Sequence, residues 1–160
     1  EYKLVVKEHP SMLGKREKGY YKAIRKLANA SLVNPLTDSF ELVKNAKLIF
    51  TITGTVGLEG VIMKKPVIVL GSTYFRFCPL VYDAKDIAPT NWPSLINEAL
   101  SNFQYEEQKL MLFLACLFSK NFKGSFQEPL ANKDKILAPE NLDVLAERIK
   151  DFIDQNRRRL

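Results

Sequence analysis

The chain has 160 residues, of which 46% are hydrophobic and 26% charged, and its formal net charge is +6. This is enough apolar mass to form the core of one globular domain. The longest apolar run, residues 110–118, is too short to cross a bilayer, which needs about 20 residues. The two cysteines, Cys78 and Cys116, form no CxxC pair, so they indicate no metal site and favour a reduced, cytoplasmic protein.

The positive charge is concentrated in the N-terminal half. Residues 1–30 contain eight Lys/Arg and three Asp/Glu, whereas residues 81–160 contain eleven and twelve. This surplus favours an anionic partner in the N-terminal half. No basic run with interleaved aromatic residues is present, so nucleic acid is not the predicted partner.

Short apolar strands alternate with helices along the chain. The predicted strands cover residues 4–6, 32–33, 48–53, 67–70 and 80–82, and the predicted helices cover residues 20–28, 39–47, 91–103, 106–122 and 142–153. Asp38 with Glu41 predicts an N-cap and capping box for the second of these helices. Residues 124–139 are expected to be irregular. Alternation of this kind predicts a three-layer α/β fold, a parallel sheet covered by helices on both faces.

The predicted helix over residues 106–122 has an unusual composition. Its centre, residues 110–118, is apolar on all sides. Such a helix is either buried or faces another domain. We therefore expect it to expose apolar surface when the chain is alone.

The first strand ends in a sequence suited to binding an anion. Pro10 stops the strand and holds His9, the only histidine, in an extended conformation. Lys7 and His9 alternate to the same face, and Glu8 points the other way. His9 could donate a hydrogen bond to a phosphate or protonate a leaving group, and a purely structural histidine beside a proline turn is equally compatible with this position.

A glycine turn with a following short helix forms the second candidate. Gly54 breaks the third strand, and Thr55 stands where a helix should begin, with Thr53 adding a second hydroxyl. A helix start carries unpaired N–H groups and partial positive charge, which suits an anion. Glycines at 57 and 60 would weaken this helix, so they require either close helix–strand packing or close approach of a ligand. Glu59, one turn on, could accept hydrogen bonds from a ribose diol or be an ordinary solvated residue.

In a parallel sheet, ligands bind beyond the carboxyl ends of the strands. Four predicted strands end at such positions, which are His9-Pro10, Asn34-Pro35, Thr53-Gly54-Thr55 and Gly71-Ser72. We expect all four to line one edge of one sheet. An ordinary βαβ unit without a ligand is the alternative.

The motifs KEHP, YY at 20–21, NP at 34–35 and TITGTVGLEG followed by KKPVIVLG resemble the bacterial capsule polysaccharide synthesis proteins. These include the 3-deoxy-D-manno-octulosonate (Kdo) transferases of capsule export. More distantly, the chain is similar to bacterial sialyltransferases that share a His-Pro motif and a paired hydroxyl motif. The resemblance covers residues 3–75 well and the remainder loosely.

The resemblance implies the C-terminal, nucleotide-sugar-binding domain of a GT-B glycosyltransferase with a Rossmann-like sheet. It places His9 and the hydroxyls of Thr53 and Thr55 on the donor phosphate, where sialyltransferases often have serines in place of these threonines. Residues 1–160 are then one donor domain, a fragment that lacks the N-terminal acceptor domain and an early strand and helix of its own. The expected nucleotide-binding residues are Lys7, His9, Pro10, Asn34, Thr53, Gly54, Thr55 and Glu59, with His9 as the catalytic residue.

The predicted function is transfer of a sugar from a nucleotide donor, a CMP-linked acidic sugar in preference to a UDP-sugar, to a glycan or glycolipid acceptor. Base selectivity would come from backbone groups near residues 33–36. No cofactor or metal is expected. The protein would be cytoplasmic, free or peripheral to the inner face of the membrane, and inactive without its N-terminal half. The alternatives are a nucleotide-sugar epimerase, a glycerol-phosphate transferase, or a non-catalytic nucleotide-binding scaffold domain.

Overall fold

A computed structural model describes residues 2–119, 121 and 133–157 of the chain. The chain divides into two compact units, Glu1–Glu106 and Glu107–Leu160. The elements of the first unit are β1 (Leu4–Lys7), η1 (Pro10–Met12), α1 (Lys18–Arg25), β2 (Ala30–Val33), α2 (Ser39–Asn45), β3 (Ile49–Thr51), α3 (Val56–Ile62), β4 (Val67–Val69), η2 (Tyr74–Phe77), β5 (Val81–Asp83), η3 (Pro89–Asn91) and α4 (Trp92–Asn102).

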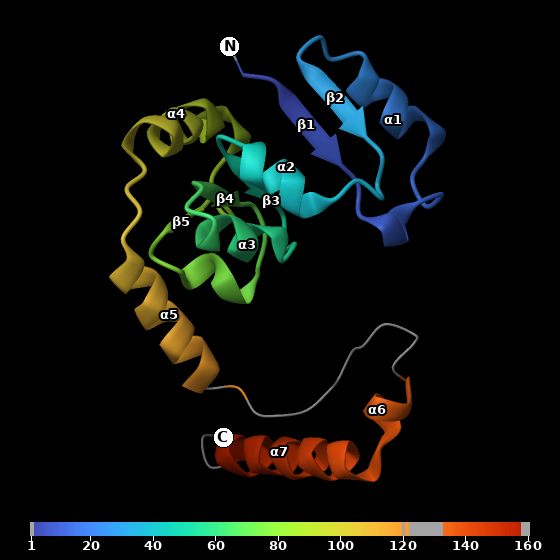
Figure 1. Cartoon of the computed structure of the whole chain (residues 1–160), viewed down its shortest axis with the longest axis vertical. Coiled ribbons are helices and arrows are strands. Elements are labelled where there is room, and N and C mark those ends of the chain that lie inside the picture. The colour runs from blue at the N-terminus through green and yellow to red at the C-terminus, as the bar shows by residue number, and fades with distance from the viewer. Residues whose placement is uncertain (1, 120, 122–132, 158–160) are drawn as a thin grey trace. The chain divides into compact units, whose positions relative to one another are not determined.

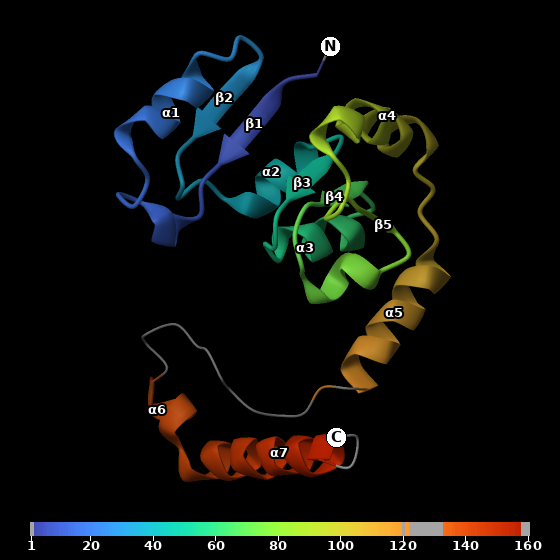
Figure 2. The ribbon, with the colours of Figure 1, turned by 180° about the vertical axis from the view of Figure 1, so that it is seen from behind.

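The strands pair in parallel, but they form two sheets. β1 pairs with β2, and β3, β4 and β5 form a three-stranded sheet in that order, as Figures 1 and 2 show from opposite sides. The α/β class and the parallel strands are therefore confirmed. The expectation of one continuous sheet is wrong for the described residues. Leu4 and Val5 in β1 remain 46% and 47% exposed, so β1 is not the doubly covered strand that a single wide sheet would contain.

Helices cover both faces of the three-stranded sheet. Ile68, at the centre of β4, packs into a cluster with Ala84 and with Ala99 of α4. Its neighbour Val67 points to the opposite face, as alternation along a strand requires, and there α3 packs closely over it. All three residues of β4 are fully buried. The predicted helix–sheet–helix layering is thus present around β3, β4 and β5.

The two glycines of α3 are explained by packing. Both are buried, and a methyl group at Gly57 would lie 2.6 Å from a ring carbon of Phe75 and 2.9 Å from Thr51 Cγ2. A methyl group at Gly60 would collide with the end of the Ile49 side chain. Close contact of α3 with β3 and η2 therefore accounts for both glycines, and ligand approach is not needed to explain them.

The second unit consists of helices. They are α5 (Glu107–Ser119), α6 (Lys133–Leu137) and α7 (Pro139–Arg157). On α5, Met111, Leu112 and Phe118 are 58%, 68% and 66% exposed, which confirms the exposed apolar surface that the sequence predicts. α6 corrects the expectation of irregular chain up to residue 139, because a short helix forms before Pro139; the part of that stretch from 124 to 132 lies outside the described residues. Within the described residues, no helix combines the length and apolarity needed to cross a membrane.

Candidate functional site

The ends of β1 and β2 lie side by side. Lys7 is the register partner of Val33, so the chain leaves both strands at the same edge, into His9 and Asn34 respectively. The sequence prediction that these two strand ends are neighbours is consistent with this register. Lys7 is half-buried at the edge, whereas His9 and Asn34 are exposed.

The local turn fixes the orientation of His9. His9 is extended (φ −66°, ψ 135°) before Pro10, as predicted, and it caps the short helix η1. Its Nδ1 accepts a hydrogen bond from the backbone N–H of Ser11 at 3.2 Å and lies 2.7 Å from Ser11 Oγ. Because a backbone N–H can only donate, Nδ1 is the acceptor and the proton of the neutral ring lies on Nε2. Nε2 is therefore the ring nitrogen that can donate a hydrogen bond, as a phosphate ligand must.

Asn34 is held by a similar local bond. Its Oδ1 accepts a hydrogen bond from the backbone N–H of Leu36 at 2.8 Å. Asparagine readily forms this kind of turn, in which its side chain accepts a hydrogen bond from the backbone two residues later. The carbonyl oxygen of the side chain is thereby occupied, and the amide nitrogen is the group left to donate to a ligand.

The glycine turn follows β3 and begins α3. The N–H of Gly54 donates to Thr51 Oγ1 at 3.0 Å, and Thr55 is the N-cap residue of α3, without a side-chain capping bond. The Thr55 hydroxyl lies 3.4 Å from Glu59 Oε1. Thr53, Gly54, Thr55 and Glu59 are all exposed. This corner presents two hydroxyls and one carboxylate to solvent.

The two halves of the candidate site belong to different sheets. Lys7 ends β1, and His9 and Asn34 follow β1 and β2, whereas Thr53 to Glu59 follow β3 of the other sheet. These residues therefore do not share one sheet edge, and their joint binding of one nucleotide stays a prediction. Among the described residues, no group of three His, Cys, Asp or Glu is placed to hold a metal ion.

Two arginines of the first unit, Arg16 and Arg76, bind carboxylates of the same chain. Arg16 binds the Glu8 carboxylate through Nε at 3.0 Å. Arg76 binds Asp83, with its Nη2 2.7 Å from Oδ2. These contacts give both arginines a structural role within the first unit.

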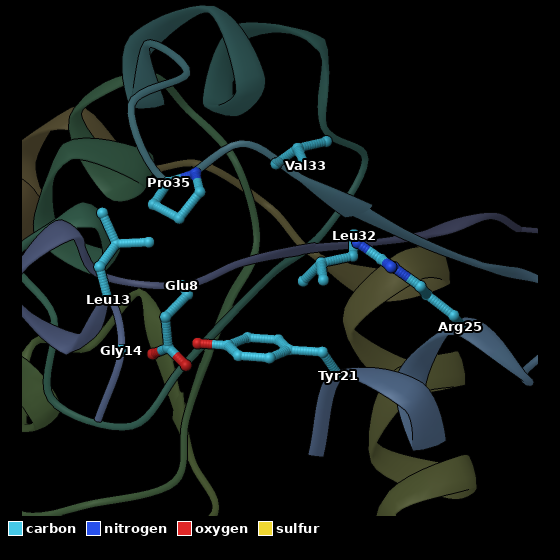
Figure 3. Close-up of a pocket in the computed structure, with 8 residues that line it drawn as sticks. All are labelled: Glu8, Leu13, Gly14, Tyr21, Arg25, Leu32, Val33 and Pro35. Atoms are coloured by element: carbon cyan, nitrogen blue, oxygen red, sulfur yellow. The ribbon is translucent and has the colours of Figure 1, made fainter. Parts of the chain in front are cut away.

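A small pocket is lined by residues that are next in sequence to His9 and Asn34. It has a volume of about 190 Å³ and is lined by Glu8, Leu13, Gly14, Tyr21, Arg25, Leu32, Val33 and Pro35. We call it the Tyr21 pocket. Glu8 precedes His9, and Val33 and Pro35 flank Asn34, so three lining residues are sequence neighbours of two predicted nucleotide ligands. In Figure 3 the Tyr21 hydroxyl points toward the Glu8 carboxylate.

The chain matches the family of capsule polysaccharide biosynthesis proteins over residues 1–111. This chain belongs to that family. The matched region contains every candidate residue, from Lys7 to Glu59. The chain is also similar to Protein FixF of Sinorhizobium fredii (strain NBRC 101917 / NGR234), with 31% identity over 134 residues, or 81% of this chain and 30% of that protein. It thus spans less than a third of that relative's length. No solved structure matches it.

The sequence predicted no site role for three residues, Ser11, Glu8 and Tyr21. Ser11 orients His9, and its position two residues later is a local signal that could have been recognised. Glu8 and Tyr21 face each other across the pocket although they are 13 positions apart in the chain. The sequence predicted only that the Glu8 side chain points away from His9. Glu8 is buried, with 9% of its surface exposed, and this burial depends on the packing of α1 and of the loop before it.

The Glu8–Arg16 pair should make stability depend on pH. The hydrogen bond from Arg16 lowers the pKa of Glu8. A carboxylate whose folded pKa is depressed stabilises the fold at pH values above its unfolded pKa, and this stabilisation is lost as the pH falls through the folded pKa. We expect Glu8→Gln to lower the Tm by a few degrees at pH 7, and the difference from the unaltered chain to shrink as the pH falls below about 4.3. Thermal unfolding followed by circular dichroism at several pH values checks this, and a difference independent of pH would contradict it.

Proposed function

We propose that this chain is the donor-binding part of a glycosyltransferase that acts in the synthesis of capsule or another surface polysaccharide. The donor is a nucleotide sugar, and its phosphate is bound by Lys7, His9 and the corner from Thr53 to Thr55. The observation that carries this proposal is the orientation of His9. Ser11 holds Nδ1 as an acceptor, so the exposed His9 ring carries its N–H donor on Nε2, just beyond a strand end where an anion would be bound.

These residues would act on the departing nucleotide. As the bond between sugar and phosphate breaks, negative charge increases on the phosphate oxygens. Lys7 and the Nε2–H group of His9 stabilise that charge by donating hydrogen bonds to the phosphate oxygens. Donors already oriented before the reaction stabilise a developing charge without further rearrangement. The Asn34 amide and the Thr55 hydroxyl orient the nucleotide, and Glu59 accepts hydrogen bonds from the ribose.

The proposal also names the two substrates and the cellular location of the enzyme. We favour a CMP-linked acidic sugar of the Kdo type over a UDP-sugar, and a glycan or glycolipid as the acceptor. The acceptor half and the catalytic base would belong to an N-terminal domain, with both domains forming a GT-B enzyme on the cytoplasmic side of the membrane. The chain by itself would then bind the donor nucleotide without turnover.

A nucleotide panel tests the proposal. We expect the chain to bind CMP with a Kd on the order of 0.1–1 mM, because a few charge-assisted bonds must offset the free-energy cost of association. Thermal unfolding in the presence of CMP, CDP, UMP or UDP at 10 mM should show the largest rise in Tm with a cytidine nucleotide. Stabilisation by UDP alone would contradict the choice of donor. No effect of any nucleotide would contradict the donor-binding function.

A further inference from the structure

We propose that the Tyr21 pocket binds the pyrimidine base of the donor nucleotide, an inference that rests on the proposed function. The pocket is the part of the described structure where apolar walls and buried polar groups converge next to the predicted phosphate ligands. Neither Glu8 nor Tyr21 has a role in the phosphate site itself. A base bound there would give the nucleotide a second point of attachment.

Two polar groups in the pocket match the edge of a pyrimidine. The Tyr21 hydroxyl is buried and has no hydrogen-bond partner, and an unpaired buried hydroxyl is unfavourable unless a ligand or water satisfies it. The Glu8 carboxylate accepts one bond from Arg16 on each oxygen, which leaves further lone pairs to accept others. A hydroxyl that can donate thus lies beside a carboxylate that can only accept. The ring edge of a pyrimidine offers the complementary pair, an N–H group next to an N or O acceptor.

The size and walls of the pocket fit one ring. Its volume is about 190 Å³, and an apolar cavity of about 150 Å³ is enough to bind benzene. Pockets for whole ligands usually measure roughly 300–1,000 Å³, so only part of a nucleotide would enter. Leu13, Leu32 and Pro35 provide apolar surface for the ring. The ribose and phosphate would lie outside, toward His9 and Asn34, which are each one residue from the pocket lining.

Removal of the Tyr21 hydroxyl tests whether the pocket binds the base, and it should not disturb the fold. Tyr21→Phe removes one oxygen that has no partner in the protein, so its Tm should not fall. We expect this variant of the whole 160-residue chain to bind CMP about fivefold more weakly, as the loss of one hydrogen bond predicts. Tyr20→Phe is the matched control, because Tyr20 is the exposed neighbour and its ring contacts Arg16 outside the pocket. This control should bind CMP as the unaltered chain does.

Ribose 5-phosphate, cytidine and AMP serve as further probes in the same titrations by NMR. Ribose 5-phosphate should bind more weakly than CMP and equally well to the chain and to its Tyr21→Phe variant. AMP, whose base has two rings, should bind more weakly than CMP. Equal affinities for CMP and ribose 5-phosphate, an unchanged CMP affinity in Tyr21→Phe, or equal affinities for AMP and CMP would overturn the base pocket while leaving the phosphate site intact. If cytidine binds in a Tyr21-dependent way and ribose 5-phosphate does not bind, the pocket is supported and the proposed phosphate site fails.

Discussion

Gly57→Ala should destabilise the first unit by about 1–2 kcal/mol, although alanine is the better helix former. The added methyl group would lie 2.6 and 2.8 Å from two ring carbons of Phe75. Phe75 is fully buried, so the ring has no free space into which to move. Overpacking of this kind costs about 1–3 kcal/mol, against a gain in helix propensity of about 1 kcal/mol at most. Thermal or urea unfolding followed by circular dichroism measures the change.

Two other glycines control this experiment. Gly19 lies in α1, and nothing is within 4 Å of a methyl group added there, so Gly19→Ala should leave stability unchanged or raise it by roughly 0.5–1 kcal/mol. At Gly60 the added methyl group would meet the end of the buried Ile49 side chain and lie 3.0 Å from Cγ2 of the fully buried Val67, so Gly60→Ala should also destabilise the first unit. A gain in stability for Gly57→Ala similar to that for Gly19→Ala would contradict the packing of α3 on Phe75.

A second substitution can isolate the contact itself. Phe75→Leu shortens the side chain against which Gly57 packs. If the ring is the obstacle, Gly57→Ala should be less destabilising in the Phe75→Leu background than alone. Equal effects in both backgrounds would mean that the two residues do not interact.

His9→Ala should weaken CMP binding by about 10–100-fold. The substitution removes the Nε2–H donor, and a hydrogen bond to a charged group contributes about 1.5–3 kcal/mol. Thr55→Val removes a hydroxyl of the other strand end and should weaken CMP binding by about fivefold. Titration of each variant with CMP, followed by NMR, gives the affinities. The variants should keep the circular-dichroism spectrum of the unaltered chain, because both side chains are exposed.

Two conservative variants distinguish the contribution of the His9 Nε2–H group to CMP affinity from that of the imidazole ring as a whole. His9→Gln can place an amide N–H near the position of Nε2 and should retain part of the affinity. Ser11→Ala leaves the imidazole in place but removes the hydroxyl that lies 2.7 Å from Nδ1, and we expect a loss of about twofold to threefold. If His9→Ala binds CMP as well as the unaltered chain does, His9 is a structural residue of the proline turn, and the non-catalytic scaffold alternative becomes the better interpretation.

Helix caps and strand ends depend on residues that are close together in the chain, so they could be predicted from the sequence. The Asp38 side chain accepts a hydrogen bond from the N–H of Phe40 at 2.9 Å, as its N-cap pattern predicts. Its partner in the predicted capping box, Glu41, instead has its carboxylate 3.9 Å from Lys44. The first four strands end within two residues of the predicted positions, because proline and glycine close to these ends disfavour further strand pairing. The third strand ends at Thr51, two residues earlier than predicted.

The pairing of strands and the shape of the pocket could not be predicted in the same way. Each strand has three or four residues, so its own pattern does not specify which neighbour it pairs with across the fold. For this reason the sequence did not predict that β1 and β2 would form a sheet of their own. The contact of Tyr21 with the region of Glu8 likewise depends on how α1 packs on β2. A tyrosine on a helix gives no sign in the sequence that its hydroxyl will be buried without a partner.

The most direct test of the donor site is a map of amide chemical-shift changes on titration of the isotope-labelled chain with CMP. Two strand ends from separate sheets are proposed to bind the same nucleotide. The predicted result is a set of shifts that saturate together at residues 7–10, 33–36 and 53–59, with a Kd on the order of 0.1–1 mM. Shifts confined to one of the two sheets, or lying mainly outside these three segments, would contradict a single donor site built from both.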